Sequence, residues 1–430
     1  MSVYLSRRTM IQTAGLAALA GPMSGAGTPE PRFEGKDTPK ICLATGDAGG
    51  GFGSGGRGGA PGGAAAQTAG AAPAGNQPPA QNPPAGAAPG TPALSPQEAN
   101  ARRIKQLGVN YVLSGGPRIP WDETALKTMM DTQKSYGLTL GNLMIQGFNN
   151  AIYGHQGRDE EIDRVIQSIH AVGKVGLPVV EYNWYAHRAT EGYFEEFDDV
   201  RTGAGWTGFD YELVHTPGRA YMARLSDAES TMKFKDLPPL ANEGAHTLDE
   251  MWATITYFLK RVIPEAEKAG VRLALHPNDP PAPVSRGSQQ IMSSVEGWKH
   301  LIEIVRSPAN GITFDCGVTR EMGHNPVEVA AYFASRDRIN HVHFRNVRVK
   351  KPYERYSEVF IDEGENNMFA VMKELVRHKY TRLIYPEHPR ALDYDRERGR
   401  IGGYPGGGGY ASFAFQVGYT RAMLQAALAS

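Results

Sequence analysis

Four side chains of the kinds that bind divalent metals stand at the ends of four successive apolar segments of the chain. They are His276, Cys316, His343 and Glu387, in the stretches LALH, FDC, HVH and YPE. A thiolate, two imidazoles and a carboxylate form a borderline-soft ligand set that suits a divalent transition metal. A lone histidine or cysteine is usually structural, but four such residues at successive segment ends predict a metal site.

The elements that must position these residues alternate along the chain. Short apolar runs bounded by turn residues predict strands, and apolar spacing near 3.6 predicts helices between them. The expected strands are 41–45, 109–114, 138–144, 178–183, 271–276, 311–316, 339–344 and 382–387. The expected helices are 95–108, 122–136, 159–175, 248–269, 295–306, 326–335, 368–378 and 412–427. This alternation predicts an α/β fold, a (β/α)8 TIM barrel with its active site at the carboxyl ends of the strands. The alternative, an open doubly wound sheet, lacks a glycine-rich phosphate loop before its first helix.

Two other residues of the ligand types are expected outside the metal site. Cys42 lies inside the first expected strand, so we expect it to be buried without a function. We expect His341 to lie on the opposite face of its strand from His343. Two cysteines in the whole chain are too few for a disulfide framework, although one bridge between them stays open.

Charge and composition narrow the classes of partner. The chain has 45 basic and 45 acidic side chains, so no net field favours nucleic acid or an anionic membrane. We therefore expect a small-molecule substrate, no nucleic acid and no membrane span after removal of the signal. The oligomeric state is open, and a homo-oligomer is compatible with the sequence.

Three segments stand apart from the barrel, which is expected to occupy residues 40–430 as a single domain. Residues 1–26 contain the pair Arg7 and Arg8 followed by a short apolar run, which predicts a twin-arginine signal and export to a periplasm. Residues 47–91 are rich in Gly, Ala and Pro and predict a disordered insertion. Residues 186–247 are too long for a simple loop and predict a lid.

The stretches LALHPNDPP, FDCG, HVHFRNV and PEH resemble the mannonate dehydratase family, whose members resemble the xylose isomerase-like barrels. The resemblance implies dehydration of D-mannonate to 2-keto-3-deoxy-D-gluconate by a lyase that needs a divalent metal, most often Mn²⁺, with Fe²⁺ as the alternative. It implies the same four ligands, His276, Cys316, His343 and Glu387.

Further roles follow from the resemblance and from position near the strand ends. The expected catalytic residues are His388 and one of Tyr404 and Tyr410, and His388 could instead orient Glu387. The expected substrate-binding residues are Arg345, Asn346, Asn183, Trp184, Asn278 and Asp279. A structural salt bridge is the competing role for Arg345.

Two other functions stay open, because Asn278, Asp362, Glu387 and Pro389 depart from the family pattern. One is isomerisation, epimerisation or elimination on another carbohydrate with the same metal barrel. The other is a non-catalytic, exported carbohydrate-binding protein, although binding alone does not need four converging ligands.

Overall fold

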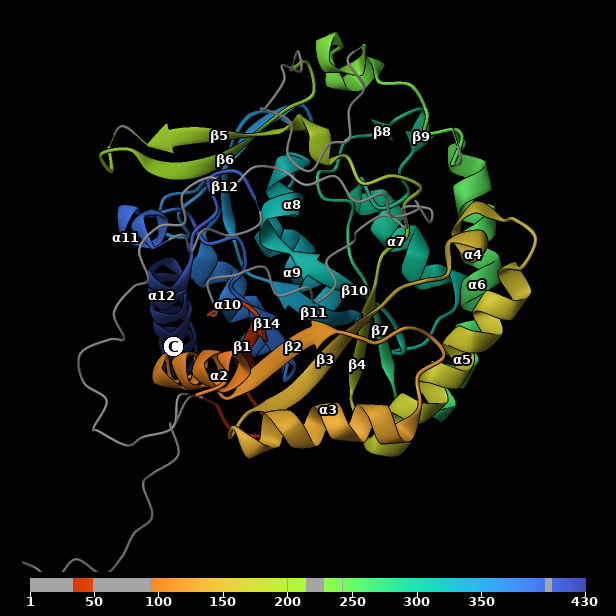
Figure 1. Cartoon of the computed structure of the whole chain (residues 1–430), viewed down its shortest axis with the longest axis horizontal. Helices are drawn as coiled ribbons and strands as arrows, with labels where there is room; N and C mark the ends of the chain where they lie inside the picture. Colours follow the sequence, from red (N-terminus) through yellow and green to blue (C-terminus); the bar gives the residue numbers. More distant parts are fainter. Residues whose placement is uncertain (1–33, 49–93, 199, 214–227, 242, 399–403) are drawn as a thin grey trace, which may run out of the picture.

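The computed structural model describes residues 34–48, 94–198, 200–213, 228–241, 243–398 and 404–430 (Figure 1). The expected export signal, residues 1–26, lies outside this part of the chain, as do residues 49–91 of the expected insertion. Among the helices of the described ranges, none has the length and apolarity needed to cross a bilayer.

A closed barrel of parallel strands forms the centre of the molecule (Figure 1). Its strands are β1 (Lys40–Ala44), β2 (Tyr111–Gly115), β3 (Thr139–Ile145), β4 (Val179–Tyr182), β7 (Arg272–Leu275), β10 (Asn310–Asp315), β11 (Ile339–His343) and β14 (Leu383–Tyr385). Their order around the barrel is β1-β14-β11-β10-β7-β4-β3-β2. Each strand overlaps one that the sequence predicts, and the predicted (β/α)8 barrel is confirmed.

Helices cover the outside of the barrel, and most of the long ones begin at a residue whose side chain caps the helix. The long ones are α2 (Pro96–Gln106), α3 (Glu123–Ser135), α5 (Arg158–Val175), α6 (Leu248–Lys268), α7 (Val295–Ile304), α9 (Pro326–Ala334), α10 (Met368–Arg377) and α12 (Tyr410–Ala429). Ser95 and Glu98 form a reciprocal capping box at α2, and Thr247 and Glu250 form another at α6. Shorter helices are α4 (Asn149–Tyr153), α8 (Cys316–Glu321) and α11 (Asp393–Glu397).

The hydrophobic core lies between the barrel and these helices. Every residue of β10 is buried, as expected for a parallel strand covered on both faces. Cys42 is also buried, in β1, and both cysteines are free thiols, so the chain has no bridge between them.

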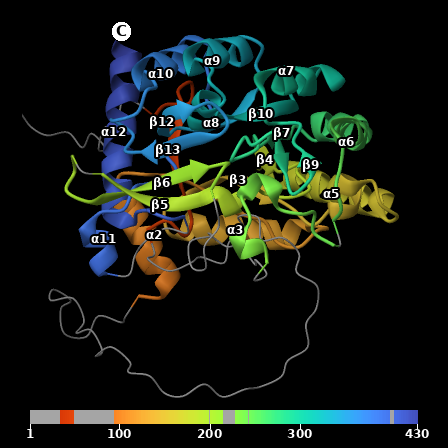
Figure 2. The same ribbon diagram turned by 90° about the horizontal axis from the view of Figure 1, so that it is seen from above.

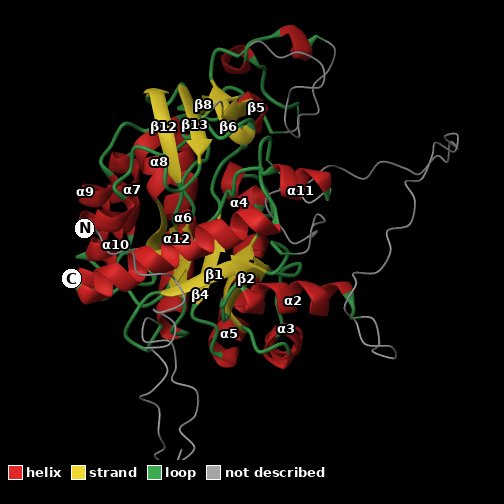
Figure 3. Ribbon diagram, turned by 90° about the vertical axis from the view of Figure 1, so that its left-hand side faces the viewer, coloured by secondary structure: helices red, strands yellow, loops and turns green. Residues whose placement is uncertain are grey.

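A second, antiparallel sheet lies at one end of the barrel (Figures 2 and 3). Its strands are β5 (Tyr193–Asp198), β6 (Ala204–Asp210), β12 (Asn346–Lys351) and β13 (Arg355–Val359), in the order β12-β13-β6-β5. A small hairpin of β8 (Val284–Ser285) and β9 (Ser288–Gln289) lies in the segment between β7 and α7. Residues 186–247, the segment expected as a lid, thus contribute β5 and β6 to this sheet. Its other two strands, β12 and β13, come directly after β11 in the chain.

Candidate metal centre and active site

Four buried side chains converge at the carboxyl ends of neighbouring barrel strands. His276 follows β7, Asp315 ends β10, His343 ends β11 and Glu387 lies just beyond β14. Each offers one ligand atom, and these atoms all lie within 4.8 Å of one another. His343 Nδ1 is 2.8 Å from Glu387 Oε1 and 3.1 Å from His276 Nε2. We call these four residues the metal group.

Asp315, and not the predicted ligand Cys316, is the residue at the end of β10 that belongs to this geometric group. β10 ends at Asp315, which pairs in register with His343, and Cys316 begins α8. The Asp315 carboxylate caps that helix by accepting a hydrogen bond of 2.8 Å from the Val318 amide. Cys316 packs in the apolar core, where burial and the neighbouring Asp315 carboxylate raise the pKa of its thiol. A protonated, core-facing thiol is a poor metal ligand.

Burial shapes the charge of the metal group. Burial and His343 lower the pKa of His276 to about 3, so this imidazole is neutral with a lone pair to donate. Burial raises the pKa of Asp315 to about 6, although Arg345 opposes the shift. Burial lowers the pKa of His343, but the carboxylates of Glu387, Glu181 and Asp315 outweigh it and raise that pKa. Two imidazoles and two carboxylates that meet in a buried space fit a divalent cation.

Arg345 lies beside the metal group in a network of ion pairs. Its side chain is 1% exposed. Its guanidinium lies 2.6 Å from Glu321, 3.0 Å from Asp315, 3.3 Å from Asp279, 3.4 Å from Glu387 and 3.7 Å from Glu358. We call Arg345 and Arg390, with the carboxylates of Asp279, Glu321 and Glu358, the arginine network. Arg345 was predicted to bind a substrate carboxylate, but the structure commits it to carboxylates of the protein itself.

Three other predicted substrate-binding residues also have structural partners. Asn346 donates to the Ile361 carbonyl at 2.9 Å and accepts from a backbone amide at 3.0 Å. The Asp279 carboxylate accepts a hydrogen bond of 2.7 Å from the Tyr193 hydroxyl and pairs with Arg345. Trp184 is fully buried in the core. These contacts give Asn346 and one Asp279 oxygen partners within the protein, whereas Trp184 Nε1 and Asp279 Oδ2 are buried without a hydrogen-bond partner among the described residues.

Asn278 and Asn183 keep a polar group available. Asn278 Oδ1 accepts from the Met292 amide at 2.8 Å, and its buried Nδ2 has no hydrogen-bond partner among the described residues. Asn183 Nδ2 lies 3.7 Å from Met144 Sδ, a weak contact at most. A ligand hydroxyl can satisfy either amide.

His388 lies directly beside the metal group and has a defined orientation. Its Nδ1 is 2.8 Å from Glu358 Oε2, and its Nε2 is 3.6 Å from Glu387 Oε2. Glu358 in turn pairs with Arg390 at 3.1 Å. The His388 backbone has φ 50°, a left-handed conformation that is uncommon for a residue other than glycine. The loop thus holds the imidazole against Glu387.

The two candidate catalytic tyrosines have different neighbours. The Tyr404 ring lies 4.3 Å from the His388 ring, and its hydroxyl is hydrogen-bonded to Arg188. Tyr410 begins α12, and its hydroxyl donates at 3.4 Å to the Arg103 carbonyl in α2. The structure therefore brings Tyr404 to His388 and corrects the prediction for Tyr410, whose helix carries it to the outer layer.

The barrel interior contains a further polar group that the sequence analysis missed. Glu181, His341 and His343 are buried, and each offers a ligand atom within 4.8 Å of the others. The His341 and His343 rings are 5.0 Å apart. The expectation that His341 lies on the other face of β11 was wrong, because residues two apart in a strand share a face. Glu181 inside the apolar run PVVEY was the available signal.

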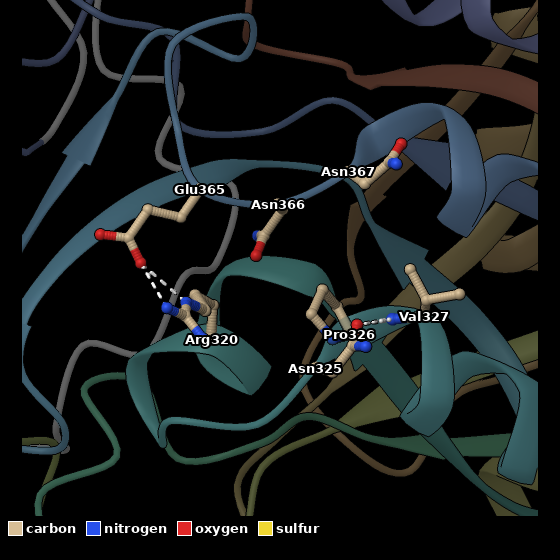
Figure 4. A pocket seen from close by; sticks show the side chains of 7 residues that line it. All are labelled: Arg320, Asn325, Pro326, Val327, Glu365, Asn366 and Asn367. Atoms are coloured by element: carbon tan, nitrogen blue, oxygen red, sulfur yellow. Dashed lines mark hydrogen bonds and ion pairs between the residues drawn. The ribbon is translucent and has the colours of Figure 1, made fainter.

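A hollow of about 430 Å³ lies apart from this site (Figure 4). Residues from α8, the start of α9 and the loop before α10 line it, and none of them was predicted as a site residue. Arg320 and Glu365 form an ion pair of 2.7 Å there, with about a third of each side chain exposed. This hollow lacks the buried donors of the metal group.

Comparisons with known proteins identify the family of the chain. The family model described as D-mannonate dehydratase (UxuA) matches residues 97–428. A mannonate dehydratase of Enterococcus faecalis is 27% identical over 310 residues, which cover 66% of this chain and 82% of the relative. One of Thermotoga petrophila is 28% identical over 339 residues, covering 70% and 88%. The crystal structure of mannonate dehydratase from Streptococcus suis serotype2 superposes with a TM-score of 0.63 at 24% identity, covering 77% of this chain and 90% of that one, which supports the fold.

Proposed function

Because the chain belongs to the D-mannonate dehydratase family, we propose that it is a hydro-lyase that converts D-mannonate to 2-keto-3-deoxy-D-gluconate and water. The family match over residues 97–428 carries this proposal. The metal group supports it, since a buried set of two imidazoles and two carboxylates lies where barrel enzymes of this kind do their chemistry.

We propose that His276, Asp315, His343 and Glu387 hold one divalent cation, Mn²⁺ by preference and Fe²⁺ as the alternative. With Asp315 in place of Cys316 the ligand set contains two carboxylates and no thiolate, and carboxylates suit Mn²⁺ better than thiolates do. When bound, the cation supplies a positive charge that acidifies the proton on C2, next to the substrate carboxylate.

His388 and Tyr404 are the proposed proton-transfer pair. One of them removes the proton from C2, and the other protonates the hydroxyl on C3, so that the C3–O bond breaks and water leaves. The resulting enol takes a proton at C3 and loses the proton of its C2 hydroxyl, which gives the keto acid. Their rings lie 4.3 Å apart, and the left-handed backbone of His388 is the kind of strain that concentrates at functional sites.

Asn278 and Asn183 are the proposed contacts to the substrate. Asn278 Nδ2 is a buried donor with no partner among the described residues, so a substrate hydroxyl or carboxylate would satisfy it. The weak contact of Asn183 Nδ2 with the Met144 sulfur is one that a sugar hydroxyl replaces at little cost. Both residues follow barrel strands at their carboxyl ends.

The test is a direct assay. Purified full-length protein is incubated with Mn²⁺ and D-mannonate, a second sample contains a chelator, and the 2-keto-3-deoxy product is measured. Metal-dependent product is expected. Protein that holds one metal per chain but forms no product would contradict the substrate, and would favour isomerisation or epimerisation of another sugar by the same barrel.

We further propose export by the twin-arginine route to a periplasm, on the basis of Arg7 and Arg8. Cell fractionation of the wild type and of the variant with both arginines replaced by lysine tests this. The wild type is expected outside the inner membrane and the variant inside the cell. Light scattering of the purified protein tests the homo-oligomer, which is still a prediction.

A further inference from the structure

A buried carboxylate reaches the metal group from inside the barrel. Glu181 is the third residue of β4 and is 2% exposed. Its Oε1 lies 3.5 Å from His343 Nε2, on the side of the ring that faces away from the other metal-group residues. A carboxylate is costly to bury in a barrel interior, so its contacts call for a physical reason.

The two ring nitrogens of His343 face different partners. Nδ1 faces the metal group, 2.8 Å from Glu387 Oε1 and 3.1 Å from His276 Nε2. Nε2 faces Glu181. A neutral imidazole carries one proton, so the nitrogen that donates its lone pair to a cation requires the proton to sit on the other nitrogen.

Two neighbouring side chains hold the Glu181 carboxylate in place. Thr313, on β10, donates its hydroxyl hydrogen to Glu181 Oε1 at 2.9 Å. Asn142, on β3, donates to Oε2 at 3.4 Å. Each comes from a strand of the barrel wall, so the carboxylate is oriented by rigid elements and not by a loop.

We propose that Glu181 is a positioning residue that keeps the proton of His343 on Nε2 and so presents the Nδ1 lone pair to the metal. Without a cation Nδ1 lies 2.8 Å from Glu387, which favours a proton on Nδ1. Once a cation occupies Nδ1, the one ring proton lies on Nε2, where the fixed Glu181 carboxylate 3.5 Å away stabilises it and makes Nδ1 more basic. This inference rests on the metal centre proposed above, but it does not depend on the identity of the substrate.

The experiment measures Mn²⁺ affinity and stoichiometry by calorimetry on the full chain, with the melting temperature as a check of folding. Glu181→Met removes the acceptor, and it is expected to weaken Mn²⁺ binding by about 10- to 100-fold. Glu181→Gln keeps a neutral hydrogen-bond acceptor and is expected to retain most of the wild-type Mn²⁺ affinity. Asn142→Leu is the matched control, because it removes only the longer contact with Glu181 and leaves the Thr313 hydrogen bond and His343 in place, and it is expected to change affinity by less than about threefold.

Several outcomes would overturn the proposal. Folded Glu181→Met with wild-type affinity would do so, as would two Mn²⁺ per wild-type chain falling to one in the variant, since Glu181 would then bind a second cation with His341. If Glu181→Met fails to fold, ¹⁵N NMR of the wild-type histidines loaded with diamagnetic Zn²⁺ decides, and a His343 Nε2 that carries no proton there contradicts the proposal. A wild type that binds no Mn²⁺ ends this inference and the metal centre together, whereas Mn²⁺ binding without mannonate turnover ends only the substrate proposal.

Discussion

The metal group and the arginine network lie side by side, and both bury several ionisable side chains. In the arginine network each carboxylate of Asp279, Glu321 and Glu358 has a guanidinium within 3.7 Å. In the metal group two carboxylates share two imidazoles, and Arg345 is the one cation of the described network that reaches them, at 3.0 and 3.4 Å.

The difference indicates which cluster is structural and which is functional. Buried charges need opposite charges, because desolvation costs several kcal/mol for each ion, at order of magnitude. The chain supplies two arginines to the arginine network, and one of them, Arg345, also reaches the metal group. In the metal group, burial raises the pKa of Asp315 to about 6 and lowers that of His276 to about 3. A bound cation would stabilise the Asp315 carboxylate and take the lone pair of the neutral His276 imidazole.

The sharpest test of this contrast compares adjacent residues. Asp315→Asn removes a charged ligand but can still cap α8 through its amide oxygen, so we expect loss of Mn²⁺ binding and a fall of roughly 10³-fold in kcat/KM, equivalent to several kcal/mol. Cys316→Ser removes the originally expected ligand and should leave both quantities within about threefold, since its thiol faces the core.

Calorimetric Mn²⁺ titration and steady-state kinetics measure both variants. The reverse result, with Cys316→Ser losing the metal and Asp315→Asn keeping it, would return the cysteine to the site and make Asp315 a helix cap alone.

The arginine network predicts a large effect on stability. Arg345→Met leaves several buried carboxylates without their cation, so we expect the free energy of unfolding to fall by about 3–5 kcal/mol. Arg320→Met is the matched control, because it breaks an ion pair with Glu365 that is about one third exposed, and it should cost less than about 1 kcal/mol.

Urea unfolding followed by circular dichroism measures both variants at pH 7. Equal destabilisation by the two substitutions would show that burial of the network is not what makes Arg345 important. Arg345→Lys, which keeps the charge but loses the planar fork, should lie between the two.

The two candidate tyrosines separate chemistry from packing. Tyr404→Phe removes a hydroxyl beside His388, and we expect kcat to fall about 10²-fold while Mn²⁺ affinity stays unchanged. Tyr410→Phe removes a hydroxyl that contacts α2 and should leave kcat within about twofold. If both variants keep the wild-type kcat, His388 must have a different partner in proton transfer.

The barrel could be predicted well because its strands are short, apolar and regularly separated by helices. Each strand can therefore be recognised from its local sequence pattern alone. Three members of the metal group were also predictable, since His276, His343 and Glu387 stand at strand ends. The fourth was missed by one residue: Asp315 ends β10 and Cys316 begins a helix, and the break between strand and helix depends on the cap that Asp315 itself provides.

The second sheet could not be predicted in the same way. β6 pairs with β13, and their residues 207 and 358 are far apart in sequence, so the pairing is a tertiary property. β5 buries the first and last residues of YFEEFD, and the four between them are partly or fully exposed, a weak pattern that resembles a polar loop. The partners of Arg345 and Asn346 likewise come from several loops, which is why their structural roles were not visible in the sequence.

The pH dependence of metal binding gives the smallest expected effect and tests the charge state of the metal group itself. Because the pKa of Asp315 is raised to about 6 by burial, this carboxyl is mostly protonated at pH 5 in the metal-free protein, and a cation must displace the proton. His276, whose pKa burial and His343 lower to about 3, is already neutral at pH 5 and adds nothing to the dependence. The raised pKa of His343 means that a proton also competes with the cation for this imidazole as the pH falls.

Mn²⁺ affinity should therefore fall by at least about tenfold for each pH unit below pH 6, and calorimetry at pH 5, 6 and 7 measures this. A flat profile between pH 5 and 7 would mean that the metal ligands are not these buried, protonated groups, and the contrast with the arginine network would be lost.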